Sequence, residues 1–125
     1  MDFQTLSTVL LLITLGIFFY IFLSGFIFGA GYEPTPRKVL RRMIELAELK
    51  GGETVYDAGS GFGRIIIEIS ERYPNVNCIG IEVDPLKVAW TRFMLKAKGL
   101  KAKVIRANIL KYDFRDADVI FTFLF

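Results

Sequence analysis

The first thirty residues constrain the fold most, because they form a run without charged side chains. No charge occurs between Phe3 and Tyr32, and residues 6–28 are almost entirely Leu, Ile, Val, Phe, Thr and Gly. About 20 apolar residues in helical form span the hydrocarbon core of a bilayer. A cleaved signal peptide is the competing interpretation, but it would have a shorter apolar region after basic residues, whereas the only early charge is Asp2. The sequence therefore predicts a transmembrane helix with its flanks at residues 1–31, which contacts the membrane through residues 6–28.

The flanks of this segment predict its orientation. Basic residues follow it closely, at Arg37, Lys38, Arg41 and Arg42. Positive flanks stay in the cytoplasm, so we expect a single-pass membrane protein with its N-terminus outside and its soluble domain on the cytoplasmic side. Gly25 and Gly29 stand four residues apart, which fits a small-xxx-small motif for helix pairing. A flexible helix end is the alternative interpretation of these glycines.

Composition excludes several kinds of site. The hydrophobic share of 53% is concentrated before Tyr32. The chain contains no histidine, which excludes Ser-His-Asp triads, His-Cys dyads and His-ligated zinc, and we expect no metal site. The single cysteine, Cys78, cannot form an intramolecular disulfide. The chain has 16 basic and 13 acidic residues, a surplus that suits nucleic acid or an anionic membrane surface equally well.

Beyond residue 32 the chain alternates between short apolar strands and helices. The expected strands are Thr54–Tyr56, Asn77–Val83, Lys103–Ala107 and Val119–Phe125. The expected helices are one from Pro36, capped by Thr35 and stopped at Gly51 and Gly52, then Arg64–Arg72 and Leu86–Lys98. This alternation predicts an α/β domain, Rossmann-like and three-layered, with about four parallel strands and right-handed crossovers. The last strand is continuously apolar, which is typical of a strand buried on both faces.

A glycine-rich turn follows the first expected strand. It reads Asp57-Ala58-Gly59-Ser60-Gly61-Phe62-Gly63, and ligands of parallel sheets bind at the carboxyl ends of the strands. A dinucleotide site needs a glycine where this chain has Arg64, and no Gly-Lys-Ser/Thr follows to form a P-loop. Asp57 would repel a pyrophosphate and attract a cation. The turn therefore predicts a site for a ligand that carries positive charge.

Two further polar residues end the next strands. Glu82 ends the second strand, where a carboxylate can accept both ribose hydroxyls of an adenosine. Asn108 follows the third strand, and its side-chain carbonyl could accept an adenine amino group. A turn before Ile109 is the alternative role of Asn108. Asp84 precedes Pro85 and is better explained as the cap of the next helix.

These segments resemble the class I S-adenosylmethionine (SAM) dependent methyltransferases. The turn at residues 57–63 resembles their motif I, and Gly80-Ile81-Glu82-Val83-Asp84-Pro85 resembles the acidic segment that follows it. A narrower likeness, carried by Tyr32-Glu33-Pro34-Thr35-Pro36 and by residues 55–61, is similar to the archaeal and mitochondrial Dot1-like protein lysine methyltransferases, whose mitochondrial members carry one membrane helix. The resemblance implies that the Pro-Thr-Pro segment folds over bound SAM and that protein lysine accepts the methyl group. A linker and a helix cap are the alternative roles of Tyr32 and Thr35.

Motifs and resemblance together define a set of candidate SAM-binding residues. The set is Tyr32, Thr35, Asp57, Gly59, Ser60, Gly61, Gly63, Glu82 and Asn108. Two positions depart from the family pattern: Phe62 stands where an acidic residue is usual, and Asn108 stands where aspartate is more common. Both departures predict weaker contact with the cofactor. The sequence identifies no catalytic base for the acceptor.

The resemblance covers residues 32–125, which we expect to form the N-terminal part of a methyltransferase domain. The class I fold has seven strands, whereas this chain reaches the fourth, in the expected order 3-2-1-4. The resemblance implies that substrate contacts also come from segments beyond the fourth strand, so we expect weak or no methyl transfer. An open edge strand invites association with other chains, so we expect self-association through this edge or through Gly25 and Gly29. An RNA or small-molecule methyltransferase and a non-catalytic SAM-binding remnant are the alternatives. The RNA alternative is favoured by the basic residues Lys96, Lys98, Lys101, Lys103 and Arg106.

Overall fold

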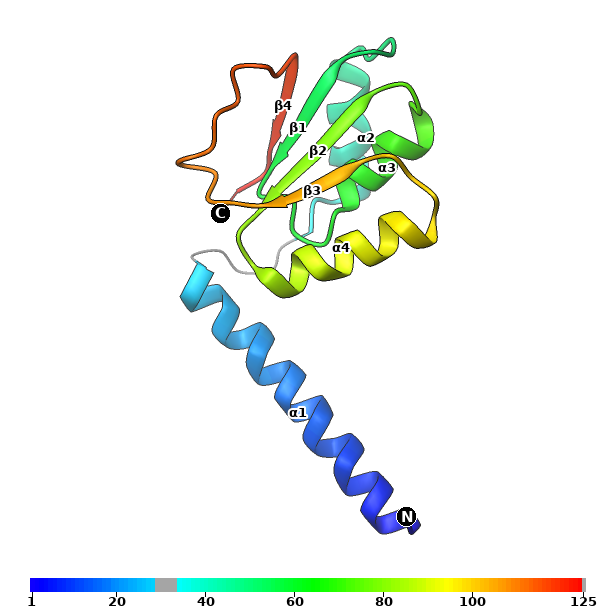
Figure 1. Cartoon of the computed structure of the whole chain (residues 1–125), viewed down its shortest axis with the longest axis vertical. Helices are drawn as coiled ribbons and strands as arrows, with labels where there is room; N and C mark the ends of the chain where they lie inside the picture. The colour runs from blue at the N-terminus through cyan, green and yellow to red at the C-terminus, as the bar shows by residue number, and fades with distance from the viewer. Residues whose placement is uncertain (29–33, 125) are drawn as a thin grey trace. The chain divides into compact units, whose positions relative to one another are not determined.

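The computed structural model describes residues 1–28 and 34–124 (Figure 1). These residues fall into two units, the helix α1 at Phe3–Phe28 and an α/β unit from Pro34 to Leu124. The α/β unit contains α2 Arg37–Leu46, β1 Thr54–Ala58, α3 Arg64–Arg72, β2 Asn77–Glu82, α4 Pro85–Ala97, β3 Lys103–Arg106 and β4 Val119–Thr122. The expected boundary between residues 31 and 32, together with Gly29, Tyr32 and Phe125, lies outside the described residues.

The α1 helix has the length and composition of a membrane-spanning helix. Its 26 residues rise about 39 Å, which exceeds the ~30 Å thickness of the hydrocarbon core. Its most apolar window has a mean hydropathy of 2.5, and none of that window is buried in the structure. Asp2 accepts the Thr5 amide at 2.7 Å in the first turn, and the Thr14 hydroxyl donates back to the Leu10 carbonyl at 2.8 Å. By length and composition α1 can cross a membrane, while its orientation stays a prediction.

Four parallel strands form the sheet in the order β3-β2-β1-β4, which confirms the predicted order (Figure 1). β1 lies between two neighbours, because Asp57 pairs with Gly80 on β2 and with Phe121 on β4. β2 continues to β3, where Glu82 pairs with Arg106. Since all four strands run in one direction, Asp57 and Glu82 lie toward the same edge of the sheet, where their carboxyl ends meet.

The three helices of the α/β unit cover one face of the sheet (Figure 1). Ile44 of α2, Ile66 and Ile69 of α3, and Val88 of α4 are at most 2% exposed and form one cluster with Val55 of β1. Burying one such side chain stabilises the fold by about 1.5–3 kcal/mol. This cluster therefore fixes the starts of α3 and α4 relative to the strand ends.

The loop at residues 107–118, which joins β3 to β4, covers the other face of the sheet. Tyr56 of β1 and Ile81 of β2 are buried under this loop. The rings of Tyr112 and Phe114 pack on Tyr56, with centroid distances of 5.7 and 5.3 Å. An open groove of about 540 Å³ on this face is lined by Tyr56, Tyr112, Asp113, Arg115 and Asp116. None of the candidate SAM-binding residues that the structure describes lines this groove.

Both ends of α2 differ from the sequence prediction. Thr35 does not cap this helix, because the N-cap is Pro36, which has φ −56° and ψ 140° and provides no side-chain hydrogen bond. The extended ψ of Pro36 leaves Thr35 outside the helix and delays the helix start by one residue. α2 also stops before Gly51 and Gly52, since Glu48 takes a positive φ of 48° and turns the chain out of the helix.

The expectation that the last strand is buried on both faces is wrong for the described residues. β4 ends at Thr122, and within it only Phe121 is buried, while Ile120 is 45% exposed. β4 pairs with β1 on one side, and no described strand lies on its other side. An apolar sequence makes burial favourable, but burial also requires a neighbouring element.

Tyr56 offers a test of the loop that covers the second face. Its hydroxyl donates to the Asp116 carboxylate, at 3.0 and 3.1 Å from the two oxygens, and burial raises the pKa of Tyr56 above its ordinary value. Tyr56→Phe keeps the ring contacts and removes the hydrogen bond, so we expect the free energy of unfolding to fall by about 1 kcal/mol in chemical denaturation. Asp116→Ala should lower the free energy of unfolding by a similar amount, and the double variant Tyr56→Phe with Asp116→Ala should lose no more than either single variant. If the two losses add in the double variant, the pairing of Tyr56 with Asp116 is contradicted.

Candidate functional site

Backbone hydrogen bonds hold the glycine turn between β1 and α3 against the end of β2. The amides of Gly59 and Ser60 donate to the Ile81 carbonyl at 2.9 and 3.0 Å, and the Gly63 amide donates to the Ser60 carbonyl at 2.9 Å. Gly59, Gly61 and Gly63 have positive φ values of 80°, 55° and 81°. Side chains with a Cβ rarely adopt this region, so the path of the turn requires the glycines.

Glu82 fastens this turn from the neighbouring strand. Its Oε2 accepts the Gly61 amide at 2.8 Å, and its Oε1 accepts the amides of Val83 and Asp84, each at 2.9 Å. The residue is 8% exposed. A carboxylate offers about four acceptor positions, so these backbone bonds leave roughly one position for a ligand. The sequence indicated a ligand contact for Glu82 but gave no sign that it also shapes the turn.

Asp57 lies beside Glu82 in a buried position. It is 2% exposed, and desolvation, followed by the negative charge of Glu82, raises the pKa of Asp57 to about 7. Because folding raises the pKa of Asp57, the folded protein favours the protonated carboxyl. The stability that Asp57 contributes is therefore complete below its unfolded pKa and is lost as the pH rises through about 7. A cation next to Asp57 would favour its ionised form.

Two other candidate residues are Ser60, within the turn, and Thr35, which is bonded to the residue that follows the turn. Ser60 is 7% exposed, and its Oγ has no hydrogen-bond partner among the residues that the structure describes. A Cβ at Gly80 would lie 2.7 Å from this Oγ, so the glycine makes room for Ser60. Thr35 is 6% exposed, and its carbonyl accepts the Arg64 guanidinium at 2.8 Å. Arg64 thereby ties the segment before α2 to the first turn of α3.

Asn108 follows β3 at the same edge and is engaged in a turn. Its side-chain oxygen accepts the Leu110 amide at 2.9 Å, and its backbone carbonyl accepts the Lys111 amide at 3.0 Å. These bonds match the turn-forming role that the sequence left open, and the adenine contact stays a prediction. Tyr32 lies outside the described part of the chain.

Thr91 of α4 supports the turn, and sequence reasoning missed it. Its side chain lies against Gly63, where a Cβ would overlap it, and its hydroxyl is 3.4 Å from the Gly61 carbonyl. α4 is placed by Asp84, whose side chain accepts the Leu86 amide at 3.0 Å, which confirms the predicted cap. A threonine within a helix gives no sequence signal that its partner is a distant glycine.

The site suits a cationic ligand with hydroxyl groups rather than a phosphate. In a phosphate-binding loop the backbone amides point at the ligand, whereas here the amides of Gly59, Ser60 and Gly61 donate to protein acceptors. Asp57 and Glu82 would both repel a phosphate. The geometry therefore disfavours a dinucleotide independently of the spacing of the glycines.

Gly63→Ala and Gly61→Ala form a matched pair that tests the contact with Thr91. Both positions have positive φ, so each alanine carries backbone strain of roughly 1–2 kcal/mol. A Cβ at Gly61 meets open space, whereas one at Gly63 overlaps Cγ2 of Thr91, and overpacking costs about 1–3 kcal/mol more. Gly63→Ala should therefore lower the free energy of unfolding further in chemical denaturation. Thr91→Ser removes Cγ2, so it should restore part of the lost stability when combined with Gly63→Ala and none when combined with Gly61→Ala. If the double variant with Gly63→Ala shows no such recovery, the contact is refuted.

Comparisons with known proteins agree with this geometry. Residues 55–125 match the methyltransferase domain family. A protein-lysine N-methyltransferase of Saccharolobus islandicus is 33% identical over 95 residues, which cover 74% of this chain and 59% of that protein. A ribosomal RNA small subunit methyltransferase A of Syntrophus aciditrophicus is 37% identical over 79 residues, which cover 63% of this chain and 27% of that protein.

A solved structure shows the same fold. The RNA methyltransferase from Salinibacter ruber, in complex with S-adenosyl-L-homocysteine, has a TM-score of 0.68 at 33% identity, over 72% of this chain and 60% of that one. The chain thus spans 59% of the S. islandicus protein and 60% of the S. ruber structure. The family match covers more than half of this chain, and it agrees with the fold and with the ligand chemistry of the turn. The chain therefore belongs to the class I SAM-dependent methyltransferases, and its cofactor is S-adenosyl-L-methionine.

Proposed function

We propose that this protein transfers a methyl group from SAM to lysine side chains of proteins. The observation that carries this proposal is the 33% identity to the S. islandicus protein-lysine N-methyltransferase, which extends over 74% of this chain. The likeness of residues 32–36 and 55–61 to the Dot1-like lysine methyltransferases supports the same acceptor. We further propose that α1 anchors the protein in a membrane, with the α/β unit on the cytoplasmic side, because α1 is uncharged and basic residues follow it.

The chain's own residues fit the cofactor. Bound SAM supplies a methyl group made electrophilic by its sulfonium. Asp57, when ionised, would attract the positive charge of the ligand, and Glu82 would accept a ribose hydroxyl in its remaining position. The buried hydroxyl of Ser60, which has no partner among the described residues, would gain a polar partner from bound SAM. The proposed set of SAM-binding residues also includes three glycines of the turn, Gly59, Gly61 and Gly63. It further includes Tyr32, Thr35 and Asn108.

The acceptor amine must reach the cofactor without its proton. The ordinary pKa of lysine is about 10.4, so the site has to favour the neutral amine by desolvation or by a neighbouring carboxylate. We assign no catalytic base. Alignment of two reactants can lower a reaction barrier by roughly 7–11 kcal/mol. The glycine turn, held by its hydrogen bond to Glu82, would keep bound SAM in a fixed position for that alignment.

RNA is a second candidate acceptor. The S. ruber protein, with 33% identity and the same fold, is an RNA methyltransferase. Exposed basic residues also occur along α4 and β3, including Lys96 and Lys103. A basic surface of this kind can bind phosphates, and such binding weakens with added salt.

The identity of the acceptor can be read from labelled products. Any methyl transfer by the detergent-solubilised chain, given radiolabelled SAM with a membrane-protein extract or with total RNA, should label protein, and acid hydrolysis should yield methylated lysine. Glu82→Ala frees amides that cost about 1–3 kcal/mol each when left unpaired, so it should weaken SAM binding and reduce the label. Label in ribonucleosides would transfer the assignment to RNA. Absence of label from both pools, with SAM binding intact, would contradict methyl transfer by this chain.

Binding of SAM should release a proton. Asp57 has a pKa of about 7 in the free protein, and a cation beside it lowers that pKa. Calorimetry at about pH 6, in two buffers of different ionisation enthalpy, should show release of up to about one proton per SAM, and the release should vanish by about pH 8. Asp57→Asn should abolish it. Equal proton release by wild type and Asp57→Asn would remove Asp57 from the site.

The orientation of the anchor can be tested with engineered cysteines. Cys78 is buried and can be replaced by serine to leave a background without thiols. In intact cells, an impermeant thiol reagent should modify Gln4→Cys and should spare Lys50→Cys, because the basic flank keeps the α/β unit inside. The reverse labelling pattern would invert the topology.

A further inference from the structure

The outward side of α4 is apolar, although no described residue covers it. Leu86, Trp90 and Phe93 follow one another at helical spacing and share one side of the helix. They are 48%, 49% and 62% exposed, and we call them the outer stripe. The opposite side of α4 carries Val88 and Leu95, which are 2% and 4% exposed and belong to the core. Since a helix that is apolar on both sides is normally buried on both, the outer stripe has the character of a binding surface.

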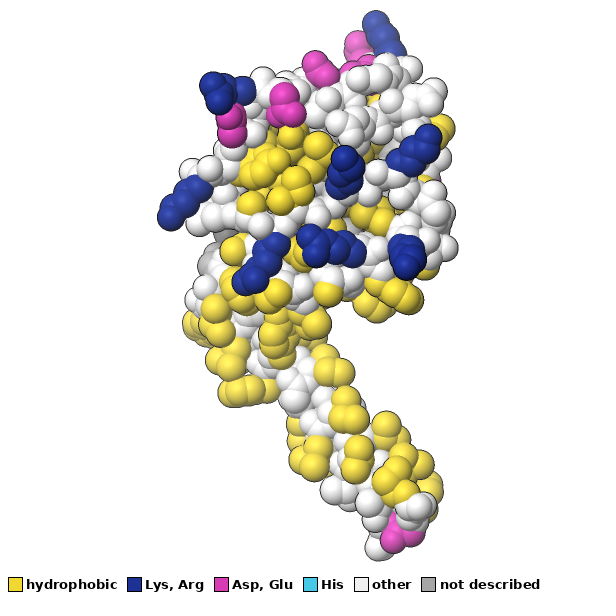
Figure 2. All heavy atoms as spheres, viewed as in Figure 1, with side chains coloured by type: hydrophobic (Ala, Val, Ile, Leu, Met, Phe, Trp, Pro, Cys, Tyr) yellow, Lys and Arg dark blue, Asp and Glu magenta, His cyan; other side chains and the backbone are white. Residues whose placement is uncertain are grey.

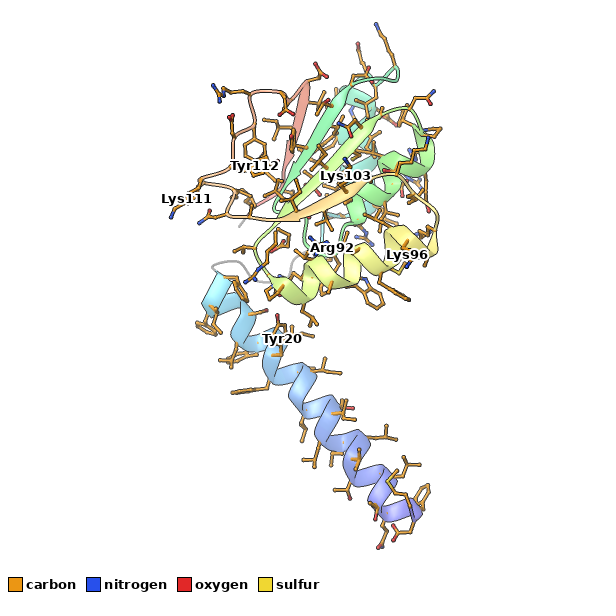
Figure 3. The ribbon with its side chains drawn as sticks, viewed as in Figure 1. Tyr20, Arg92, Lys96, Lys103, Lys111 and Tyr112 are labelled. Carbon is orange, nitrogen blue, oxygen red and sulfur yellow. The ribbon has the colours of Figure 1, made fainter. Side chains whose placement is uncertain are left out.

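Basic side chains border the outer stripe. Arg92 and Lys96 are exposed, and α4 contains no acidic residue. Neither cation forms a salt bridge within the described part of the chain. Figure 3 shows Lys103 and Lys111 in the same view of the α/β unit as Arg92 and Lys96. On the face that Figure 2 shows, the visible acidic side chains of the α/β unit lie at its upper end.

An anionic lipid surface fits this combination of side chains. Helices that lie in the membrane interface place Trp, Phe and Leu at the boundary of headgroups and acyl chains, while Lys and Arg contact anionic headgroups. Single-stranded RNA would need open aromatic faces for base stacking. Here the rings of Trp90 and Phe93 pack on each other, with a centroid distance of 6.0 Å and an interplanar angle of 41°. Leu86 adds aliphatic surface that offers no stacking.

The short connection to α1 keeps the α/β unit close to a membrane. α1 ends at Phe28 and the α/β unit begins at Pro34, and the chain between them can extend at most about 21 Å. A tethered surface meets its partner at a high effective concentration, so even a small apolar stripe with two cations can be occupied.

We propose that the outer stripe of α4, with Arg92 and Lys96, inserts into the headgroup region of an anionic bilayer. This rests on the proposed anchor α1 and is independent of the methyl acceptor. Because α4 begins next to Glu82, this contact brings the edge of the sheet that carries the glycine turn to the membrane surface. Acceptors within reach would then be segments of membrane proteins close to the lipid headgroups.

The single tryptophan of the chain makes the contact directly observable. Trp90 is the only tryptophan, so its fluorescence reports on α4 without mutation. The full chain is reconstituted in phosphatidylcholine vesicles with or without phosphatidylglycerol, with bromine on the acyl chains as a quencher. We expect quenching of Trp90 in the anionic vesicles, less quenching in the neutral ones, and its decrease with salt, as the Debye length shrinks from about 10 Å at 0.1 M to about 3 Å at 1 M.

Matched variants separate this contact from the anchor. Arg92→Gln with Lys96→Gln, and separately Leu86→Ser with Phe93→Ser, should lose the quenching, whereas Lys50→Gln with Lys101→Gln makes the same change of charge elsewhere and should keep it. All these positions are exposed, and unchanged circular dichroism confirms folding. Flotation of every variant with neutral vesicles reports the anchor separately, and a chain that fails to float overturns both proposals. If the chains float but Trp90 is not quenched in the anionic vesicles, or is quenched equally in all variants, the proposed insertion of the outer stripe is overturned. Salt-dependent binding of single-stranded RNA through Arg92 and Lys96, without lipid quenching, would reassign the surface to nucleic acid.

Discussion

The site depends on the carboxylate of Glu82. It accepts the Gly61 amide from the turn after β1 and the amides of Val83 and Asp84 at the start of α4. Partly buried amides without an acceptor cost about 1–3 kcal/mol each, so this one side chain holds a turn whose positive φ angles are strained for any residue but glycine. The same negative charge contributes to the raised pKa of Asp57. Glu82 thus sets both the shape and the charge of the ligand edge.

Two buried carboxylates explain the choice of ligand. Burial, followed by the negative charge of Glu82, raises the pKa of Asp57 and so disfavours its ionisation, and a bound cation would offset that cost. A pyrophosphate would increase the repulsion, and the turn has already committed the amides of Gly59, Ser60 and Gly61 to protein acceptors. The hydrogen bonding and the charge of this glycine-rich turn therefore favour a cationic ligand over a pyrophosphate. The glycines by themselves would fit several nucleotides.

Local signals predicted the bounds of α3 and the cap at Asp84, because each depends on neighbouring residues, whereas the strand order was predicted from the resemblance to the class I fold. Long-range contacts could not be predicted in this way. The prediction that Thr35 caps α2 was wrong, because Pro36 has an extended backbone and the carbonyl of Thr35 accepts a hydrogen bond from Arg64 of α3. The burial of β4 was overestimated, because apolar composition does not reveal whether a neighbour is present. The support of the turn by Thr91 joins α4 to a glycine that is distant in sequence, and nothing local announces it.

This chain is 33% identical both to a protein named for lysine methylation and to a solved structure named as an RNA methyltransferase, so the resemblance of the domain by itself does not identify the acceptor. The geometry of the turn favours a cationic cofactor over a dinucleotide. Calorimetric titration of the full chain with SAM and with NAD, under identical conditions, measures that selection directly. Tighter binding of SAM is the predicted result, and tighter binding of NAD would contradict the assignment of the carboxylates and of the turn.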